Sequence, residues 1–120
     1  MKASLETFFN AWSDADTQSR EDIFGAALSN NIRYSDPRSG NRLQGISSVN
    51  DYVGQFSANA PGWRAWVESV DEVNGYARAI VAFGGKGPDG EDMVQHGTYF
   101  ATADADGKLD LLAGFVGTGQ

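Results

Sequence analysis

Residues 63–116 alternate between long β-type segments and tight turns, and this run limits the chain to a fold built on a large antiparallel sheet. Asn74 and Gly75 carry the clearest turn signal, because a type I′ hairpin turn needs positive φ at both central positions. The pattern predicts strands over residues 63–73, 76–83, 92–103 and 108–116. A sheet of this length must bury one face, so the rest of the chain is expected to cover it.

The first half of the chain supplies elements that can provide this cover. Apolar residues at i, i+3, i+4 and i+7 predict a helix over residues 3–14. Similar patterns predict helices over 19–28 and 46–58, with a short strand over 32–36 between them. The expected order ααβαββββ is typical of an α+β fold with helices on one face of the sheet. The expected core residues are Leu5, Phe8, Phe9, Trp12, Phe24, Leu28, Val53 and Phe56.

Composition narrows the class of protein further. A length of 120 residues predicts one domain over 1–120, and 41% hydrophobic with 21% charged residues is ordinary for a globular protein. The net charge of −7 argues against nucleic acid as a partner. No apolar run is long enough to span a membrane, and the first residues lack the apolar core of a signal peptide. We therefore expect a cytoplasmic protein with no membrane partner.

One acidic residue stands where a predicted strand must end. Pro37 lacks a backbone N–H and forces Asp36 into an extended conformation. A carboxylate held on a strand end and directed inward can serve as a proton acceptor. The dipeptide is also a common turn former, so Asp36 has a structural interpretation as well as a chemical one.

Other potential sites are weaker. His96 is the only histidine; it shares a strand face with Thr98 and is a candidate proton donor or acid–base group. Residues 84–90 lack the spacing of a phosphate-binding loop, and the segment from Asp104 lacks the glutamate that a calcium loop needs at its twelfth position. With no cysteine and one histidine we expect no metal and no cofactor.

Taken together, the motifs resemble the nuclear-transport-factor-2-like superfamily in its SnoaL-like branch. The resemblance rests on Trp12 and Asp16, on Tyr34-Ser35-Asp36-Pro37 with Gly45, on Tyr52-Val53, and on Asp106-Gly107-Lys108-Leu109. It covers nearly the whole chain. It implies a curved antiparallel or mixed sheet wrapped around the N-terminal helices, forming a cone with an apolar cavity. Relatives include ketosteroid isomerase, polyketide cyclases, dehydratases, epoxide hydrolases and non-catalytic binding proteins, so the fold alone does not define an activity.

The resemblance to ketosteroid isomerase is partial. Asp36 matches the position of its general base, which is also followed by proline. The position of its oxyanion-binding tyrosine is occupied by Phe9, which cannot donate a hydrogen bond. Its second donor, a protonated aspartate, maps near residues 96–99, where there is no carboxyl group. His96 or Tyr99 is left as the possible donor, so a true ketosteroid isomerase is not expected.

The favoured interpretation is a cofactor-independent proton-transfer enzyme of isomerase, cyclase or dehydratase type. It would act on an apolar, carbonyl-bearing small molecule, with Asp36 as general base and His96 polarising or protonating the substrate. The expected pocket residues are Trp12, Tyr34, Tyr52, Trp66 and Tyr99. Two alternatives stay open: a ligand-binding or association module without turnover, and an epoxide-type hydrolase in which Asp36 activates water.

A homodimer is also expected. In the last strand, Leu109, Leu111, Ala113 and Phe115 are predicted to face the cavity, and Leu112 and Val116 the opposite side. Apolar residues on that opposite side, together with Ile80, suggest a partner packed sheet to sheet.

Overall fold

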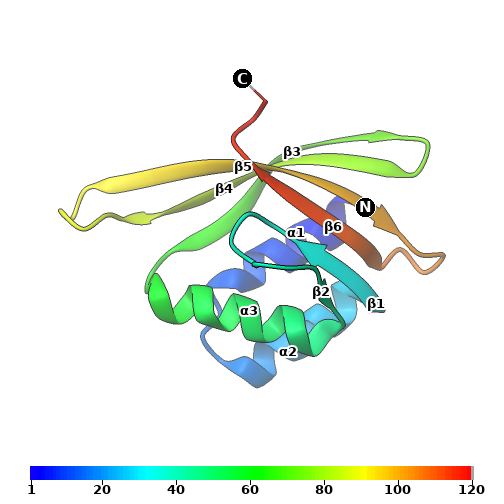
Figure 1. Ribbon diagram of the computed structural model, residues 1–120, viewed down its shortest axis with the longest axis horizontal. Coiled ribbons are helices and arrows are strands. Elements are labelled where there is room, and N and C mark those ends of the chain that lie inside the picture. The colour runs from blue at the N-terminus through cyan, green and yellow to red at the C-terminus, as the bar shows by residue number, and fades with distance from the viewer. Residues whose placement is uncertain (120) are drawn as a thin grey trace.

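The computed structural model describes residues 1–119, and its secondary structure follows the predicted order with one addition (Figure 1). The helices are α1 (Lys2–Asn10), a 3₁₀ turn η1 (Ala11–Ser13), α2 (Thr17–Ala27) and α3 (Ile46–Asn59). The strands are β1 (Leu28–Ser35), β2 (Leu43–Gln44), β3 (Arg64–Val73), β4 (Tyr76–Lys86), β5 (Asp92–Ala103) and β6 (Leu109–Val116). The two-residue β2 was not predicted, because it lies in the polar, glycine-bearing loop after Asp36.

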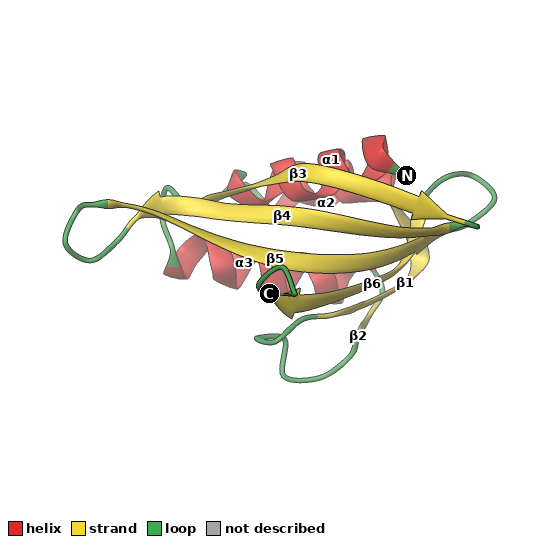
Figure 2. Ribbon diagram, turned by 90° about the horizontal axis from the view of Figure 1, so that it is seen from above, coloured by secondary structure: helices red, strands yellow, loops and turns green. Residues whose placement is uncertain are grey.

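The six strands form one mixed sheet in the order β2-β1-β6-β5-β4-β3. All neighbours are antiparallel except β1 and β6, which pair in parallel. Viewed from above, the sheet curves over the helices without closing on itself, and all three helices lie on one of its faces (Figure 2). The α+β cone expected from the sequence is confirmed. No helix within residues 1–119 has the length and hydropathy needed to cross a membrane.

The core lies between the helices and the covered face of the sheet. Phe8 is at its centre, with its ring centroid 4.9 Å from that of Phe9 and 4.8 Å from that of Phe24. Of the expected core residues, Phe56 is only partly buried, because it faces the cavity described below. The others are buried: Leu5, Phe8, Phe9, Trp12, Phe24, Leu28 and Val53.

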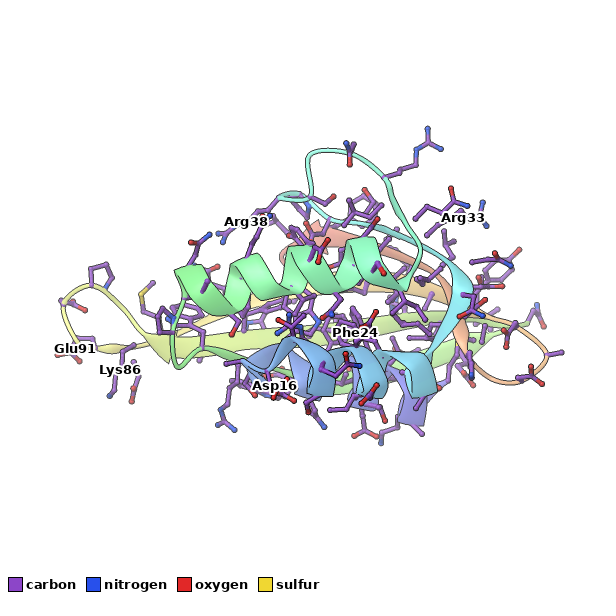
Figure 3. All side chains as sticks on the ribbon, turned by 90° about the horizontal axis from the view of Figure 1, so that it is seen from below. Asp16, Phe24, Arg33, Arg38, Lys86 and Glu91 are labelled. Carbon is purple, nitrogen blue, oxygen red and sulfur yellow. The ribbon has the colours of Figure 1, made fainter. Side chains whose placement is uncertain are left out.

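Helix α2 begins two residues before its predicted start, because Asp16 caps it (Figure 3). The Asp16 carboxylate accepts hydrogen bonds from the backbone N–H groups of Gln18 and Ser19, at 3.0 and 3.1 Å. These bonds satisfy donors that have no partner within the helix.

A buried arginine joins α2 to α3. Arg20 is 2% exposed, and its guanidinium donates to the Asn50 side-chain oxygen, to the Asn50 carbonyl and to the Asp14 carbonyl. Asn50 in turn donates to the Thr17 carbonyl at 3.2 Å. A Cβ at Gly54 would lie 2.7 Å from the Arg20 guanidinium, so this glycine leaves room for the contact. The network holds α3, and with it the side chains that α3 presents to the sheet.

The predicted facing of β6 was wrong. The pairing of β5 with β6 shifts between Thr102 and Ala103, so one extra residue enters β6. Such a bulge reverses the facing of every residue beyond it. Leu109 and Leu112 are therefore both buried, and Phe115, which was expected inside, is 57% exposed on the outer face.

Gly114 on β6 is expected to be intolerant of any side chain. A Cβ there would overlap the ring of Tyr99 on the neighbouring strand. We expect Gly114→Ala to lower the free energy of unfolding by about 1–3 kcal/mol, as overpacking of a filled core does. Urea denaturation measures this change. Gly25→Ala in α2 is the control, since nothing lies within 4 Å of its Cβ and alanine favours a helix by up to about 1 kcal/mol. Equal effects of the two substitutions would contradict the expectation.

Candidate functional site

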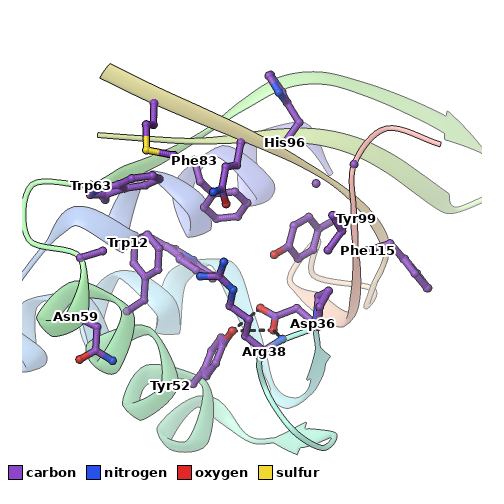
Figure 4. A pocket seen from close by; sticks show the side chains of 18 of the residues that line it. Trp12, Asp36, Arg38, Tyr52, Asn59, Trp63, Phe83, His96, Tyr99 and Phe115 are labelled. Atoms are coloured by element: carbon purple, nitrogen blue, oxygen red, sulfur yellow. Dashed lines mark hydrogen bonds between the residues drawn. The ribbon is translucent and has the colours of Figure 1, made fainter. Parts of the chain in front are cut away.

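A cavity opens between the covered face of the sheet, α3 and the loop that follows β1, with a volume of about 990 Å³ (Figure 4). Its aromatic lining residues are Trp12, Tyr52, Phe56, Trp63, Phe83, Tyr99 and the exposed Phe115. The polar side chains that line it are few: Asp36, Arg38, Gln55, Asn59, Gln95, His96 and Thr118. A large apolar pocket with a small number of polar side chains is typical of a small-molecule site.

Asp36 is held at the edge of this cavity by several donors. Its carboxylate accepts hydrogen bonds from the Tyr34 hydroxyl at 2.6 Å and from the Tyr52 hydroxyl at 2.7 and 2.8 Å to the two oxygens. The backbone N–H of Arg38 donates to it at 2.9 Å. The Ser39 hydroxyl contacts both the N–H and the carbonyl of Asp36. Both the turn interpretation and an inward-facing carboxylate are therefore compatible with the geometry.

The hydroxyl groups form a directional chain. The Tyr99 hydroxyl lies 3.2 Å from that of Tyr34. Since Tyr34 gives its proton to Asp36, its oxygen accepts the proton of Tyr99. The chain runs from Tyr99 on β5 through Tyr34 on β1 to Asp36, and Tyr52 on α3 meets the same carboxylate. Four of the predicted site residues, Tyr34, Asp36, Tyr52 and Tyr99, thus lie in one cluster.

Burial of these tyrosines changes their ionisation. Loss of water raises the pKa of Tyr34 well above its ordinary value, and the neighbouring Tyr99 and Asp36 add to the effect. Burial likewise raises the pKa of Tyr99, which the hydrogen bond to Tyr34 partly offsets. Burial and the hydrogen bond to Asp36 raise the pKa of Tyr52. All three side chains are therefore neutral hydrogen-bond donors at ordinary pH.

These shifts predict a loss of stability in alkaline solution. Above about pH 10 the tyrosines of the unfolded chain ionise while the clustered ones keep their protons, so the folded state binds more protons. The free energy of unfolding is then expected to fall as pH rises beyond 10, and to be unaffected by these groups below it. Three of the four tyrosines belong to the cluster, so most tyrosinate absorbance at 295 nm should appear together with unfolding. Gradual ionisation near pH 10 in a folded protein would contradict this.

Trp12 completes the inner wall of the pocket. It is 2% exposed, and its ring packs against those of Phe56 and Phe83, with centroids 5.1 and 5.4 Å away. Its indole N–H is buried without a hydrogen-bond acceptor within residues 1–119. An unpaired buried donor costs free energy that an acceptor on a bound molecule would recover.

His96 does not join the tyrosine cluster. It lies on β5 at the opposite facing from Tyr99, and it borders the cavity with its side chain directed away from Asp36 (Figure 4). Its imidazole Nε2 lies 3.2 Å from a carboxylate oxygen of Glu68 on β3, near the outer surface. The alternation of side chains along a strand shows that His96 and Tyr99 lie on opposite faces of the sheet. It does not show which of the two faces inward.

Trp66, unlike His96, does not line the cavity. Trp66 is in β3, on the same face of the sheet as Arg64. The guanidinium carbon of Arg64 is 4.9 Å from the centroid of the Trp66 ring. Its ring covers Gly84 on the outer face of the sheet. Trp63 occupies the corresponding inner position, where its indole N–H donates to the Lys86 carbonyl at 2.9 Å.

Arg38 is a pocket residue that sequence patterns did not indicate. It is exposed on the loop after β1, a segment that predicts only a turn, and it lines the cavity near Asp36. Its position beside the Asp36-Pro37 turn was the one available signal. Within the described residues 1–119, no three His, Cys, Asp or Glu side chains are grouped so as to hold a metal ion.

Comparison with known proteins relates the chain to others through its structure. No family model and no curated protein matches the sequence. A proposed isomerase of the SnoaL-like family from Agrobacterium tumefaciens matches with a TM-score of 0.80 and 24% identity, over 97% of this chain and 96% of that one. An NTF2-like protein of unknown function from Exiguobacterium matches with a TM-score of 0.74 and 22% identity, over 98% and 99% of the two chains.

The matches share a fold and differ in their described activities. An LEH-like epoxide hydrolase from M. tuberculosis matches with a TM-score of 0.69 and 15% identity, over 97% of this chain and 81% of that one. The chain therefore has the cone-shaped fold of NTF2-like, SnoaL-like and ketosteroid-isomerase-like proteins. Because one fold carries different activities, the function must be argued from the site.

Proposed function

We propose that the protein is a proton-transfer enzyme that acts on an apolar, carbonyl-bearing small molecule without a cofactor, with Asp36 as general base. The observation that carries the proposal is a carboxylate surrounded by tyrosine hydroxyls in the wall of an aromatic cavity. An ionised acid supplies the base, and neutral phenols supply donors for the negative charge that forms on a carbonyl oxygen. His96 and Trp66 have no part in this mechanism.

The hydrogen bonds imply how the base becomes available. Tyr52 contacts both oxygens of Asp36, so it must release at least one before that oxygen can approach a substrate carbon. The carbon–hydrogen bond then breaks, its proton goes to Asp36, and its electron pair moves to the carbonyl oxygen as an enolate. Tyr52, once released, donates to that oxygen, since the proton of Tyr99 is already given to Tyr34. Return of the proton to a different carbon completes an isomerisation.

One observation favours the non-catalytic alternative. Three donors already bind the Asp36 carboxylate: the hydroxyls of Tyr34 and Tyr52 and the backbone N–H of Arg38. A carboxylate that only stabilises a turn would have the same hydrogen bonds. In that case the cavity binds a small molecule and does not transform it.

Deuterium exchange separates the two functions without knowledge of the natural substrate. The protein is incubated in D₂O with 2-tetralone and with 3-benzoylpropionate, and loss of the α-proton signals is followed by NMR. Exchange faster than in buffer at the same pH supports the enzyme. Saturable binding of both compounds with the buffer rate of exchange would overturn the catalytic proposal in favour of the binding protein.

The same proposal includes a homodimer formed through the outer face of the sheet. Phe100 and Phe115 are 46% and 57% exposed there, and their ring centroids are 5.9 Å apart. An exposed aromatic pair on an uncovered sheet face is an attractive surface for a second copy. A standard interface buries about 1,600 Å² in total and is occupied at micromolar concentrations.

Sedimentation velocity tests the dimer. We expect a dimer at tens of micromolar protein and a monomer for Phe115→Glu. The control is Val73→Glu, which adds the same charge at a 66% exposed residue at the end of β3. A monomeric wild-type protein would contradict the proposal, and so would equal dissociation by both variants.

A further inference from the structure

The mechanism leaves one charged residue of the cavity without a role. Arg38 follows Asp36 and Pro37 on the loop after β1, and Figure 4 shows its side chain directed into the pocket on the side of Asp36 and Tyr52. Within residues 1–119 its guanidinium has no carboxylate within 4.0 Å, Asp36 included. It is also the only lysine or arginine among the described residues that line the cavity. The cavity therefore holds a cation with no partner of its own.

The loop fixes the backbone from which the Arg38 side chain extends. The Arg38 backbone N–H is bound to Asp36, and Ser39 binds the N–H and carbonyl of Asp36. The backbone of Arg38 is thus bound to the same carboxylate that acts as the base in the proposed mechanism. The charge of Arg38 also acts on Tyr52, whose hydroxyl contacts Asp36.

The charge of the rest of the protein makes this position unusual. A chain with a net charge of −7 repels anions over most of its surface. A guanidinium is a planar donor that binds carboxylate and sulfonate oxygens in pairs, and it is the natural partner for an anion in an otherwise apolar pocket. The neighbouring polar residues Gln55, Asn59 and Gln95 supply no charge.

We propose that the ligand of this cavity is an amphipathic anion, with an apolar body against the aromatic wall and a carboxylate or sulfonate bound by Arg38. The inference rests on the proposed function and names the substrate class of the same site. The acidic end is held at Arg38, and the apolar carbonyl portion extends toward Asp36, Tyr52 and Tyr99. The like charge of Asp36 keeps the acidic end from binding in the reverse orientation.

Two fluorescent probes of similar shape test the proposal. 8-Anilinonaphthalene-1-sulfonate carries one negative charge, and N-phenyl-1-naphthylamine is its neutral counterpart. We expect both to bind the wild-type protein and to compete for one site. Arg38→Gln is expected to weaken the sulfonate about tenfold, which corresponds to about 1.4 kcal/mol, and to change the affinity of the neutral probe less than twofold. Added salt should weaken only the sulfonate.

Two control variants make the result specific. Arg42→Gln removes the same charge from the same loop at an exposed residue that does not line the cavity, and it should leave both affinities unchanged. Gln55→Trp narrows the cavity from α3 and should weaken both probes, which places them inside it.

The outcomes separate this inference from the proposed function. Equal weakening of the sulfonate by Arg38→Gln and Arg42→Gln would overturn the inference, because the effect would then be one of total charge. Unchanged sulfonate binding in Arg38→Gln would overturn it as well, while binding of the neutral probe would leave the proposed function standing. Failure of both probes to respond to Gln55→Trp would remove the cavity as a ligand site and with it both proposals.

Discussion

Replacement of Asp36 by asparagine is expected to lower the rate of deuterium exchange by about 10²–10⁴-fold, the usual contribution of a general base. The amide has nearly the shape of the carboxylate, and with its oxygen in the place of Oδ2 it still accepts the hydroxyl protons of Tyr34 and Tyr52. It has no basic oxygen that can take a proton from carbon. The loss should therefore appear in turnover, with probe binding within a few-fold of the wild-type value.

The control for this prediction is Asp16→Asn. It makes the same chemical change at the cap of α2, outside the cavity, and asparagine caps a helix as well as aspartate does. Exchange by this variant should match the wild type. Full activity in a folded Asp36→Asn protein would remove the proposed base and leave Asp36 as a turn residue.

The largest effect on stability is expected from Phe8→Ala. Phe8 is completely buried, and its ring contacts those of Phe9, Trp12, Phe24 and Tyr34. Removal of a fully buried phenylalanine ring costs about 3–5 kcal/mol, from lost burial and from the cavity left behind. This is a large part of the roughly 5–15 kcal/mol that stabilises a protein of this kind. The midpoint of urea unfolding should fall accordingly, with little change in slope.

Phe115→Ala makes the same chemical change on the outer face. Because this ring is 57% exposed, the substitution should cost less than about 1 kcal/mol when measured at a concentration where the protein is monomeric. A cost as large as that of Phe8→Ala would show that the outer face, and not the helix-covered one, supplies the main core.

Much of the fold followed from local patterns. The spacing of Leu5, Phe8, Phe9 and Trp12 defines a helix face, and the Asn74-Gly75 turn fixes the pairing of β3 with β4. The facing of β6 did not follow, because the bulge near Asp110 is set by pairing with β5 and has no signal of its own. Strand β2 was missed for a similar reason: two residues pair with β1 only because the chain returns beside it.

The candidate site was predictable where residues are fixed by local geometry. Asp36 ends its strand because Pro37 follows, and Tyr34 two residues earlier shares its facing. His96 and Trp66 were placed in the site by residue type, and their facing depends on the whole sheet, which turns both outward. Arg38 carried no pattern, since its importance comes only from the cavity that it enters.

The parallel pairing of β1 with β6 has a consequence for how the molecule is made. Tyr34 pairs with Leu112, close to the end of the chain, and Leu28 pairs with Leu109. The strand that carries Tyr34 and leads to Asp36 has β2 on one edge soon after it is made, but it gains β6 on its other edge only after residues 109–113 have been synthesised. Contacts between residues so distant in sequence form slowly, because a long loop must close first. A nascent chain would therefore form its helices and the β3–β4 hairpin early, and the pairing of β1 with β6 would follow in a late step of folding.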